Sequence, residues 1–78
     1  MNGFLKFVLD HPSIEIFIRR SELSDQGVVV TMVHPRSLKK ISQIIDSDVL
    51  SMNSPIDVEI QNTVSEFMYK KLMEGVEP

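Results

Sequence analysis

Val28-Val29-Val30-Thr31-Met32-Val33 is the stretch that decides the fold of this chain. It carries no charge, most of its side chains are β-branched, and it lies between Gly27 and Pro35. Since β-branched side chains favour the pleated surface of a sheet, the stretch predicts a strand. Because it is apolar on both faces, we expect the central strand of a sheet, with cover on both sides.

The residues before this strand alternate between two faces. In residues 13–20 the three isoleucines fall on one face and the residues between them fall on the other: Ile14, Ile16 and Ile18 against Glu15, Phe17 and Arg19. This period of two predicts a half-buried antiparallel strand. The polar segment 21–27 ends in glycine and predicts a loose hairpin loop that leads into the central strand.

Residues 38–46 fit two structures. They follow a turn at 34–37, where Pro35 fixes φ and removes a hydrogen-bond donor. A helix would place Leu38, Ile41 and Ile45 on one face, whereas a strand would place Ile41 and Ile45 on one face and Ile44 on the other. The short length favours a third strand that pairs with the central one, and the helix stays open as the alternative.

Helical patterns flank the predicted strands. Residues 2–10 predict a short N-terminal helix that His11-Pro12 ends, because the residue before a proline is pushed out of the α region. Its apolar side chains recur at helical spacing and predict the face that packs on the sheet: Phe4, Leu5, Val8 and Leu9. After the strands, Val49, Leu50 and Met52 predict a short apolar connection, in which Asp46 or Ser47 can start one helical turn.

The C-terminal segment carries the signals of a capped helix. Ser54 stands at the N-cap position, Pro55 at the first helical position and Asp57 three residues after the cap. Gly75 stands where a residue with left-handed backbone ends a helix. The side chains expected in the buried stripe of this helix are Ile60, Val64, Phe67, Met68 and Leu72.

These elements predict a single small α+β domain over residues 1–78, in the order α-β-β-β-α. The sheet is expected to be a three-stranded antiparallel meander. Both the short N-terminal helix and the long C-terminal helix are expected on its Ile14, Ile16 and Ile18 face. The opposite face is then expected to expose Phe17 and part of the row that alternates from Val29 to Val33, as a contact surface.

Size and composition limit the stability of this domain. The chain has 78 residues, no cysteine and a net charge of −3. A domain of this size buries only about 60 to 65% of the surface that its unfolded chain exposes, and no disulfide or thiolate-bound metal can add stability. Pairing with another copy or another protein is therefore expected. The apolar N-terminal run is too short to span a membrane, so we expect no membrane segment.

No residue pattern indicates catalysis, a cofactor or a metal ion. The chain lacks a cysteine nucleophile, a glycine-rich phosphate loop and a glycine-framed serine elbow. His11 and His34 each precede a proline and are interpreted as turn residues. Asp46-Ser47-Asp48 lacks the glycine and glutamate spacing of a calcium loop. We predict a protein that is not an enzyme and that binds no cofactor or metal.

Protein binding is the first functional hypothesis. The open face of the sheet and the outer side of the C-terminal helix are the surfaces expected to dock onto a partner that the sequence does not identify. The thin core and the additional apolar surface also predict a homodimer. Its interface is expected to use side chains that lie off the packing faces: Phe17, Val29, Tyr69 and Met73.

Nucleic-acid binding is the second hypothesis. The end of the first strand and the start of the third are expected to bring five cations together as a phosphate-binding patch: Arg19, Arg20, Arg36, Lys39 and Lys40. The negative net charge and the lack of stacking aromatic residues on the later strands argue against nucleic acid.

Two stretches carry a resemblance to a known class of sequence. Residues 11–20, His-Pro-Ser-Ile-Glu-Ile-Phe-Ile-Arg-Arg, and residues 28–45 resemble short uncharacterised reading frames of temperate phages and prophages of Gram-positive bacteria. The likeness covers residues 4–72 and rests on a β-meander followed by a capped helix. It implies a phage or prophage accessory protein in the cytoplasm of a bacterial host, acting by binding a host or phage protein, and it implies no functional residues.

Overall fold

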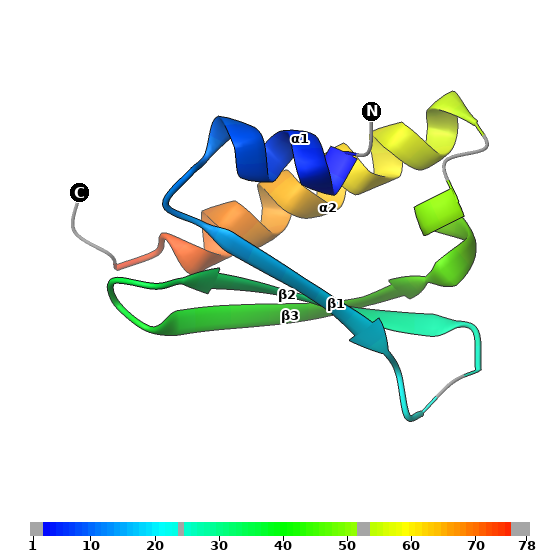
Figure 1. Cartoon of the computed structure of the whole chain (residues 1–78), viewed down its shortest axis with the longest axis horizontal. Helices are drawn as coiled ribbons and strands as arrows, with labels where there is room; N and C mark the ends of the chain where they lie inside the picture. Colours follow the sequence, from blue (N-terminus) through cyan, green and yellow to red (C-terminus); the bar gives the residue numbers. More distant parts are fainter. Residues whose placement is uncertain (1–2, 24, 52–53, 76–78) are drawn as a thin grey trace.

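The computed structural model describes residues 3–23, 25–51 and 54–75, and it arranges them as a sheet with a pair of helices on it (Figure 1). The elements follow the chain in this order: α1 (Gly3–Asp10), β1 (Glu15–Arg20), β2 (Gly27–His34), β3 (Lys39–Asp46), the 3-10 turn η1 (Ser47–Ser51) and α2 (Pro55–Leu72). The predicted α+β fold with the order α-β-β-β-α is confirmed.

β2 is the central strand, as predicted. The strand order is β1-β2-β3 and both pairs are antiparallel. Ile18 lies opposite Val30, whereas Phe17 lies opposite Thr31 and Thr31 lies opposite Ser42. Side chains directly opposite each other share a face of the sheet. One face therefore carries Ile18 and Val30, and the other carries Phe17, Thr31 and Ser42.

Residues 39–46 form a strand, so the helical alternative is wrong. Leu38 accounts for the difference, because its φ of 61° lies in the left-handed region and cannot start a right-handed helix. Its N–H donates to the carbonyl of His34 at 2.8 Å and closes the turn. The turn returns the chain alongside β2, and all eight residues of β3 pair with it.

Both helices lie on one side of the sheet, as predicted (Figure 1). They cover the face that carries the isoleucines of β1. The buried residues of this core are Phe4, Phe7, Ile14, Val28, Val30, Met32, Ile45, Met68 and Leu72. No described helix covers the other face, which we call the open face. The expectation that β2 is covered on both sides is therefore wrong for the described part of the chain.

The buried stripe of α2 differs from the predicted one. Met68 and Leu72 are fully buried as expected, and Val64 packs beside them, but Ile60 is 37% exposed and Phe67 is 53% exposed. Gln61 and Ser65 take the inner positions in their place. α2 packs against α1 and η1 as well as the sheet. With this additional contact, the buried line of the helix runs through Gln61, Ser65, Met68 and Leu72, two polar and two apolar residues.

α1 is also turned relative to the prediction. Gly3, Phe4 and Phe7 are its buried residues, whereas Leu5 is 53% exposed and Leu9 is 62% exposed. The reason is that α1 packs against α2 in addition to β1. A Cβ atom at Gly3 would lie 2.8 Å from the Cβ of Gln61, so glycine permits this close approach of the two helices.

The ends of α2 follow the sequence signals. The hydroxyl of Ser54 accepts a hydrogen bond of 3.3 Å from the N–H of Asp57, and Pro55 is the first helical residue. Gly75 has a φ of 76°, in the left-handed region. Residues 47–51 form the predicted helical turn, whereas Met52 lies outside the described residues. None of the helices seen in the described ranges has the length and apolar character needed to cross a membrane.

Candidate interaction surface

Large apolar side chains are exposed on several sides of the domain. They are Leu5, Leu9, Phe17, Ile18, Leu23, Leu38, Ile44, Ile56, Ile60 and Phe67. One group of three lies on the helix side of the sheet and comprises Leu5 and Leu9 of α1 and Ile18 of β1, whereas Phe17 of β1 lies on the open face. A second group of three belongs to α2 and comprises Ile56, Ile60 and Phe67. Because the first group spans a helix and an edge strand, the side of the molecule formed by α1 and β1 is the first candidate for a contact surface.

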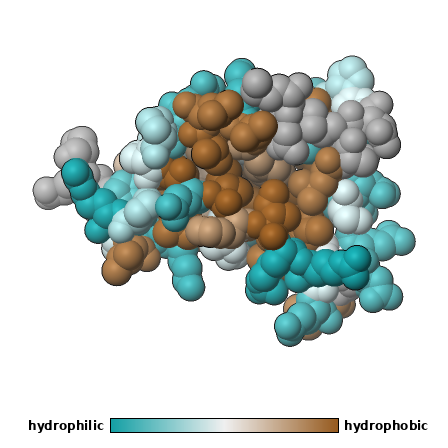
Figure 2. Space-filling view, viewed as in Figure 1, coloured by the Kyte–Doolittle hydropathy of each residue, from teal (hydrophilic) through white to brown (hydrophobic). Residues whose placement is uncertain are grey.

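A shallow apolar groove lies between α1 and β1. Phe4, Leu5 and Val8 line it from the helix, Ile16 and Ile18 line it from the strand, and its volume is about 310 Å³. Figure 2 shows an apolar area that extends from α1 to the strands in the middle of this side of the molecule. We call this feature the α1–β1 groove. Its lining suits the apolar side chains of another molecule.

The outer edge of β1 presents backbone groups beside this groove. β1 pairs with β2 alone among the described strands. Ser21 donates its N–H to the carbonyl of Gly27 at 3.0 Å, so these two residues form a hydrogen-bonded pair. Hydrogen-bonded and non-hydrogen-bonded pairs alternate along an antiparallel ladder. Because the backbone groups of Ser21 face β2, those of every second residue before it do the same. The backbone groups of Ile16, Ile18 and Arg20 therefore point away from β2.

The ladder between β2 and β3 obeys the same alternation. Ser47 donates its N–H to the carbonyl of Gln26 at 2.7 Å, so Thr31 and Ser42, five pairs further along, form a non-hydrogen-bonded pair. Side chains approach most closely in such pairs. The hydroxyls of Thr31 and Ser42 are indeed 2.8 Å apart. The alternation that assigns the outer edge of β1 therefore agrees with the short distance between these two hydroxyls.

The open face holds two of the residues predicted for a dimer interface. Phe17 is 56% exposed, as expected, but Val29 is only 8% exposed. Val29 lies between Arg19 and Ile44 in the register and lines a hollow of about 490 Å³ that also includes Leu23. The prediction that Val29 is accessible is wrong, because side chains on the neighbouring strands cover it.

The other two predicted interface residues lie on the helix side of the sheet. The ring of Tyr69 is 5.4 Å from that of Phe7 and 4.7 Å from that of His11, and Tyr69 packs against the core. Met73 forms the C-cap of α2 and is half-buried. Tyr69 therefore does not lie off the packing faces, because the rings of Phe7 in α1 and of His11, the residue after α1, lie against it. The four predicted residues do not share one surface.

The predicted phosphate patch is divided between the two ends of the sheet. Lys40 of β3 and Glu15 of β1 both lie opposite Val33 of β2, whereas Arg19 lies opposite Val29. Four residues along a strand separate these rows by about 13 Å. The division leaves Arg19 and Arg20 at one end and Arg36, Lys39 and Lys40 at the other. The prediction of a single patch is wrong, because antiparallel β1 ends at the opposite end of the sheet from the start of β3.

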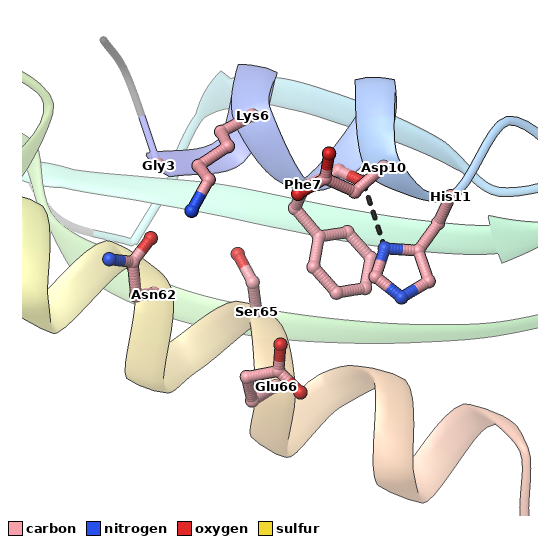
Figure 3. Close-up of a pocket in the computed structure, with 8 residues that line it drawn as sticks. All are labelled: Gly3, Lys6, Phe7, Asp10, His11, Asn62, Ser65 and Glu66. Carbon is pink, nitrogen blue, oxygen red and sulfur yellow. Dashed lines mark hydrogen bonds between the residues drawn. The ribbon is translucent and has the colours of Figure 1, made fainter.

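A polar cleft of about 250 Å³ lies between α1 and α2. Figure 3 shows the side chain of Lys6 and the hydroxyl of Ser65 pointing into it from opposite helices. The ring of His11 stacks on that of Phe7 at 4.0 Å, and its Nδ1 lies 3.0 Å from the Phe7 carbonyl. Ser65 is 1% exposed, and its hydroxyl makes no hydrogen bond to a described group. That the protein is not an enzyme stays a prediction.

The histidines serve local structure where the chain is described. Nδ1 of His34 accepts a hydrogen bond of 3.2 Å from the N–H of Ser37 in the turn before β3. Within residues 3–23, 25–51 and 54–75, no three histidine, aspartate or glutamate side chains gather as ligands of a metal ion would. That the protein binds no metal or cofactor stays a prediction.

The α1–β1 groove was not predicted from the sequence, because Leu5 and Ile18 were expected on the packing faces. One signal was available. Leu5 and Leu9 are four residues apart, whereas Phe4, Phe7 and His11 form a second line at helical spacing. Two such lines on one short helix cannot both pack on the same layer, so one of them had to face outward.

The groove and the outer edge of β1 lie side by side, and we call them together the β1 edge surface. It combines an apolar hollow with a row of outward-pointing backbone donors and acceptors. The resemblance to phage reading frames stays a prediction. No protein-family model matches the chain, and no curated protein or solved structure is significantly similar to it.

Proposed function

We propose that the protein is a non-catalytic protein-binding module that docks an apolar segment of a partner on its β1 edge surface. The observation that carries the proposal is the position of the α1–β1 groove next to the outward backbone of Ile16 and Ile18. A partner strand added to β1 would bond to this backbone, and every second side chain of the partner would enter the groove. Backbone pairing would supply affinity, and the groove would select apolar side chains.

The resemblance to phage reading frames extends this proposal. It suggests an accessory protein of a phage or prophage that works in the cytoplasm of a bacterial host cell and binds a host or phage protein. Such a role requires a binding surface and no catalytic site. The exposed apolar side chains of α1 and β1 support a role of this kind.

Nucleic-acid binding has less support. The cations on which it depended lie at opposite ends of the sheet. The chain carries a net charge of −3, which opposes association with a polyanion. The salt dependence of binding separates the two functions, because phosphate contacts weaken steeply with added salt whereas apolar docking changes little.

A matched pair of variants tests the proposed surface. Ile18→Lys places a charge in the groove, and Ile44→Lys places the same charge on the open face of β3 at a similar exposure, 52% against 43%. We expect immobilised wild-type protein and Ile44→Lys to capture the same protein from a bacterial lysate, and Ile18→Lys to lose it. Far-UV circular dichroism checks that both variants fold.

Two results would contradict the proposal. Equal capture by Ile18→Lys and Ile44→Lys would show that the groove does not bind the partner. Capture that is abolished by nuclease treatment and by moderate salt would favour the nucleic-acid alternative instead.

A further inference from the structure

The outer edge of β1 restricts the strands that can pair with it. When two antiparallel strands pair across a two-fold axis, residues with outward backbone groups must face each other. On β1, Ile16 and Ile18 are two such residues. An axis through Phe17 sets Ile16 of one copy opposite Ile18 of a second copy, and both of the resulting pairs exchange backbone hydrogen bonds.

The side chains of β1 favour this register over its neighbours. With the axis at Phe17, Glu15 of each chain lies opposite Arg19 of the other, and the two Phe17 rings meet at the axis. An axis at Ile18 would set Phe17 opposite Arg19, and an axis at Ile16 would set Phe17 opposite Glu15. Opposite charges and aromatic pairs stabilise cross-strand neighbours. Glu15 and Arg19 are exposed and form no ion pair with a described residue, and the guanidinium of Arg19 makes a long hydrogen bond of 3.4 Å to the carbonyl of Arg20.

Pairing at β1 would also cover apolar surface of α1. The α1–β1 grooves of the two chains would meet on the helix side of the joined sheets, where Leu5 and Leu9 are more than half exposed. Each large apolar side chain contributes on the order of 100 Å² of buried area. With the strand backbone and the charged pairs, the contact reaches about 600 Å² per chain, the lower end of the range for stable interfaces.

The edge formed by β3 offers a poorer match to itself. The midpoint of β3 lies between Ser42 and Gln43, and the backbone groups of Ser42 and Ile44 point away from β2. An axis at Gln43 would therefore set glutamine against glutamine where β1 sets phenylalanine against phenylalanine. Lys39 and Lys40 open this strand, and lysine is typical of edges that avoid pairing. One apolar edge per chain gives a closed dimer, whereas two would give a filament.

We propose that two copies of the chain pair through β1, antiparallel and centred on Phe17, to form a homodimer with one continuous sheet of six strands. The inference rests on the proposed function, because it uses the β1 edge surface and names a second copy of the chain as its partner, so that another protein reaches this surface only by displacing the second copy. Phe17 is the residue retained from the predicted dimer interface. Val29, Tyr69 and Met73 have no part in this pairing.

Cysteine cross-linking tests the register, because the chain has no cysteine of its own. In the Phe17→Cys variant of the proposed dimer, the cysteines at position 17 of the two chains lie opposite each other as a non-hydrogen-bonded pair. Their Cα atoms are then about 4.5 Å apart, a separation that a disulfide can bridge. We expect this variant to become a covalent dimer under mild oxidation. The matched control is Gln43→Cys next to the midpoint of β3, which we expect to stay largely uncross-linked. Stronger cross-linking through Gln43→Cys would place the interface on the other edge and overturn the proposal.

Exchange of the two charges tests the pairing without cysteine. Glu15→Arg and Arg19→Glu each convert two pairs of opposite charge into two pairs of like charge. We expect each change alone to raise the dissociation constant of the dimer by about tenfold or more. The double variant restores opposite charges, and so does an equimolar mixture of the two single variants. Sedimentation equilibrium measures recovery in both, and no recovery in either would overturn the register.

The outcomes separate this inference from the proposed function. A wild-type mass of one chain at about 100 μM overturns the dimer. If that monomer still captures a lysate protein in an Ile18-dependent way, the docking function stands and only the second copy fails as its partner. If the dimer shows the expected cross-link but captures no other protein, the pairing is supported and the docking of other proteins is contradicted.

Discussion

The backbone N–H of Gly3 donates a hydrogen bond of 2.7 Å to the side-chain oxygen of Gln61, a residue 58 positions later in the chain. The Nε2 of Gln61 in turn donates to the carbonyl of Val49 at 2.6 Å. One buried amide therefore joins α1, η1 and α2. This is the physical reason that a polar residue occupies an inner position of α2, since a buried amide is tolerated when its groups are hydrogen-bonded.

Replacing Gln61 by leucine is expected to lower the free energy of unfolding by about 2 to 4 kcal/mol, because it leaves a backbone N–H and a carbonyl without partners. Urea denaturation followed by circular dichroism measures the change. Asn62→Leu, at the exposed neighbouring position, is the control and is expected to change stability by less than about 0.5 kcal/mol. Equal stability of the Gln61→Leu variant and the wild type would show that the hydrogen bonds make no net contribution.

Gly3→Ala tests the close approach of the two helices. Helix propensity alone favours alanine by up to about 1 kcal/mol. The added Cβ, however, would lie 2.8 Å from the Cβ of Gln61 and from the Oδ1 of Asn62. We expect the steric contact to dominate and the free energy of unfolding to fall by about 1 to 2 kcal/mol. A more stable variant in thermal denaturation would mean that α1 shifts freely and that the helix contact is loose.

Adjacent residues of α2 test how far the helix is turned. Met68 is fully buried, whereas Phe67 is 53% exposed with Nζ of Lys71 at 5.8 Å from its ring centroid. We expect Met68→Ala to lower the free energy of unfolding by about 2 to 4 kcal/mol through a cavity in the core. Phe67→Ala is expected to lower it by less than about 1 kcal/mol. If urea denaturation shows that Phe67→Ala lowers the free energy of unfolding more than Met68→Ala does, Phe67 belongs to the buried stripe, as predicted from the sequence.

Leu38 is expected to be a position at which a change stabilises the protein. Its φ of 61° is unfavourable for a side chain with a Cβ, and the leucine is 79% exposed, so no packing compensates. Leu38→Asn or Leu38→Gly should raise the free energy of unfolding by about 0.5 to 1 kcal/mol. Leu38→Ala keeps the Cβ and should have a smaller effect. A loss of stability in both of the first variants would show that the exposed leucine has a contact outside the described residues.

The strands were predictable because their signals are local. Proline and the β-branched run fix β2, and the alternating isoleucines fix which face of β1 is covered. The rotation of the helices was not predictable in the same way. A periodic stripe shows that a helix has an apolar side. The rotation of the helix about its own axis, however, depends on the element that it packs against. For α2 that element is α1, whose Gly3 permits contact with polar Gln61 in place of the apolar Ile60.

The candidate surface was only partly accessible from the sequence for a related reason. Phe17 alternates out of the core and is exposed, as its pattern predicts. The basic residues do not form one patch, because the directions of the strands decide which strand ends lie together. The end of β1 and the start of β3 lie at opposite ends of the sheet. The groove required the positions of two elements together, namely the outward line of α1 and the free edge of β1.

The contact between α1 and α2 also sets an order of assembly during synthesis. α1 emerges from the ribosome before the meander, whereas Gln61, Met68 and Leu72 of α2 are made after it. The meander joins segments that are neighbours in the chain and can close early, whereas docking of α1 on α2 closes a loop of about 60 residues and comes later. A nascent chain stopped before α2 would therefore present a bare strand edge and two unpacked phenylalanines, which is the kind of surface that chaperones shield from aggregation.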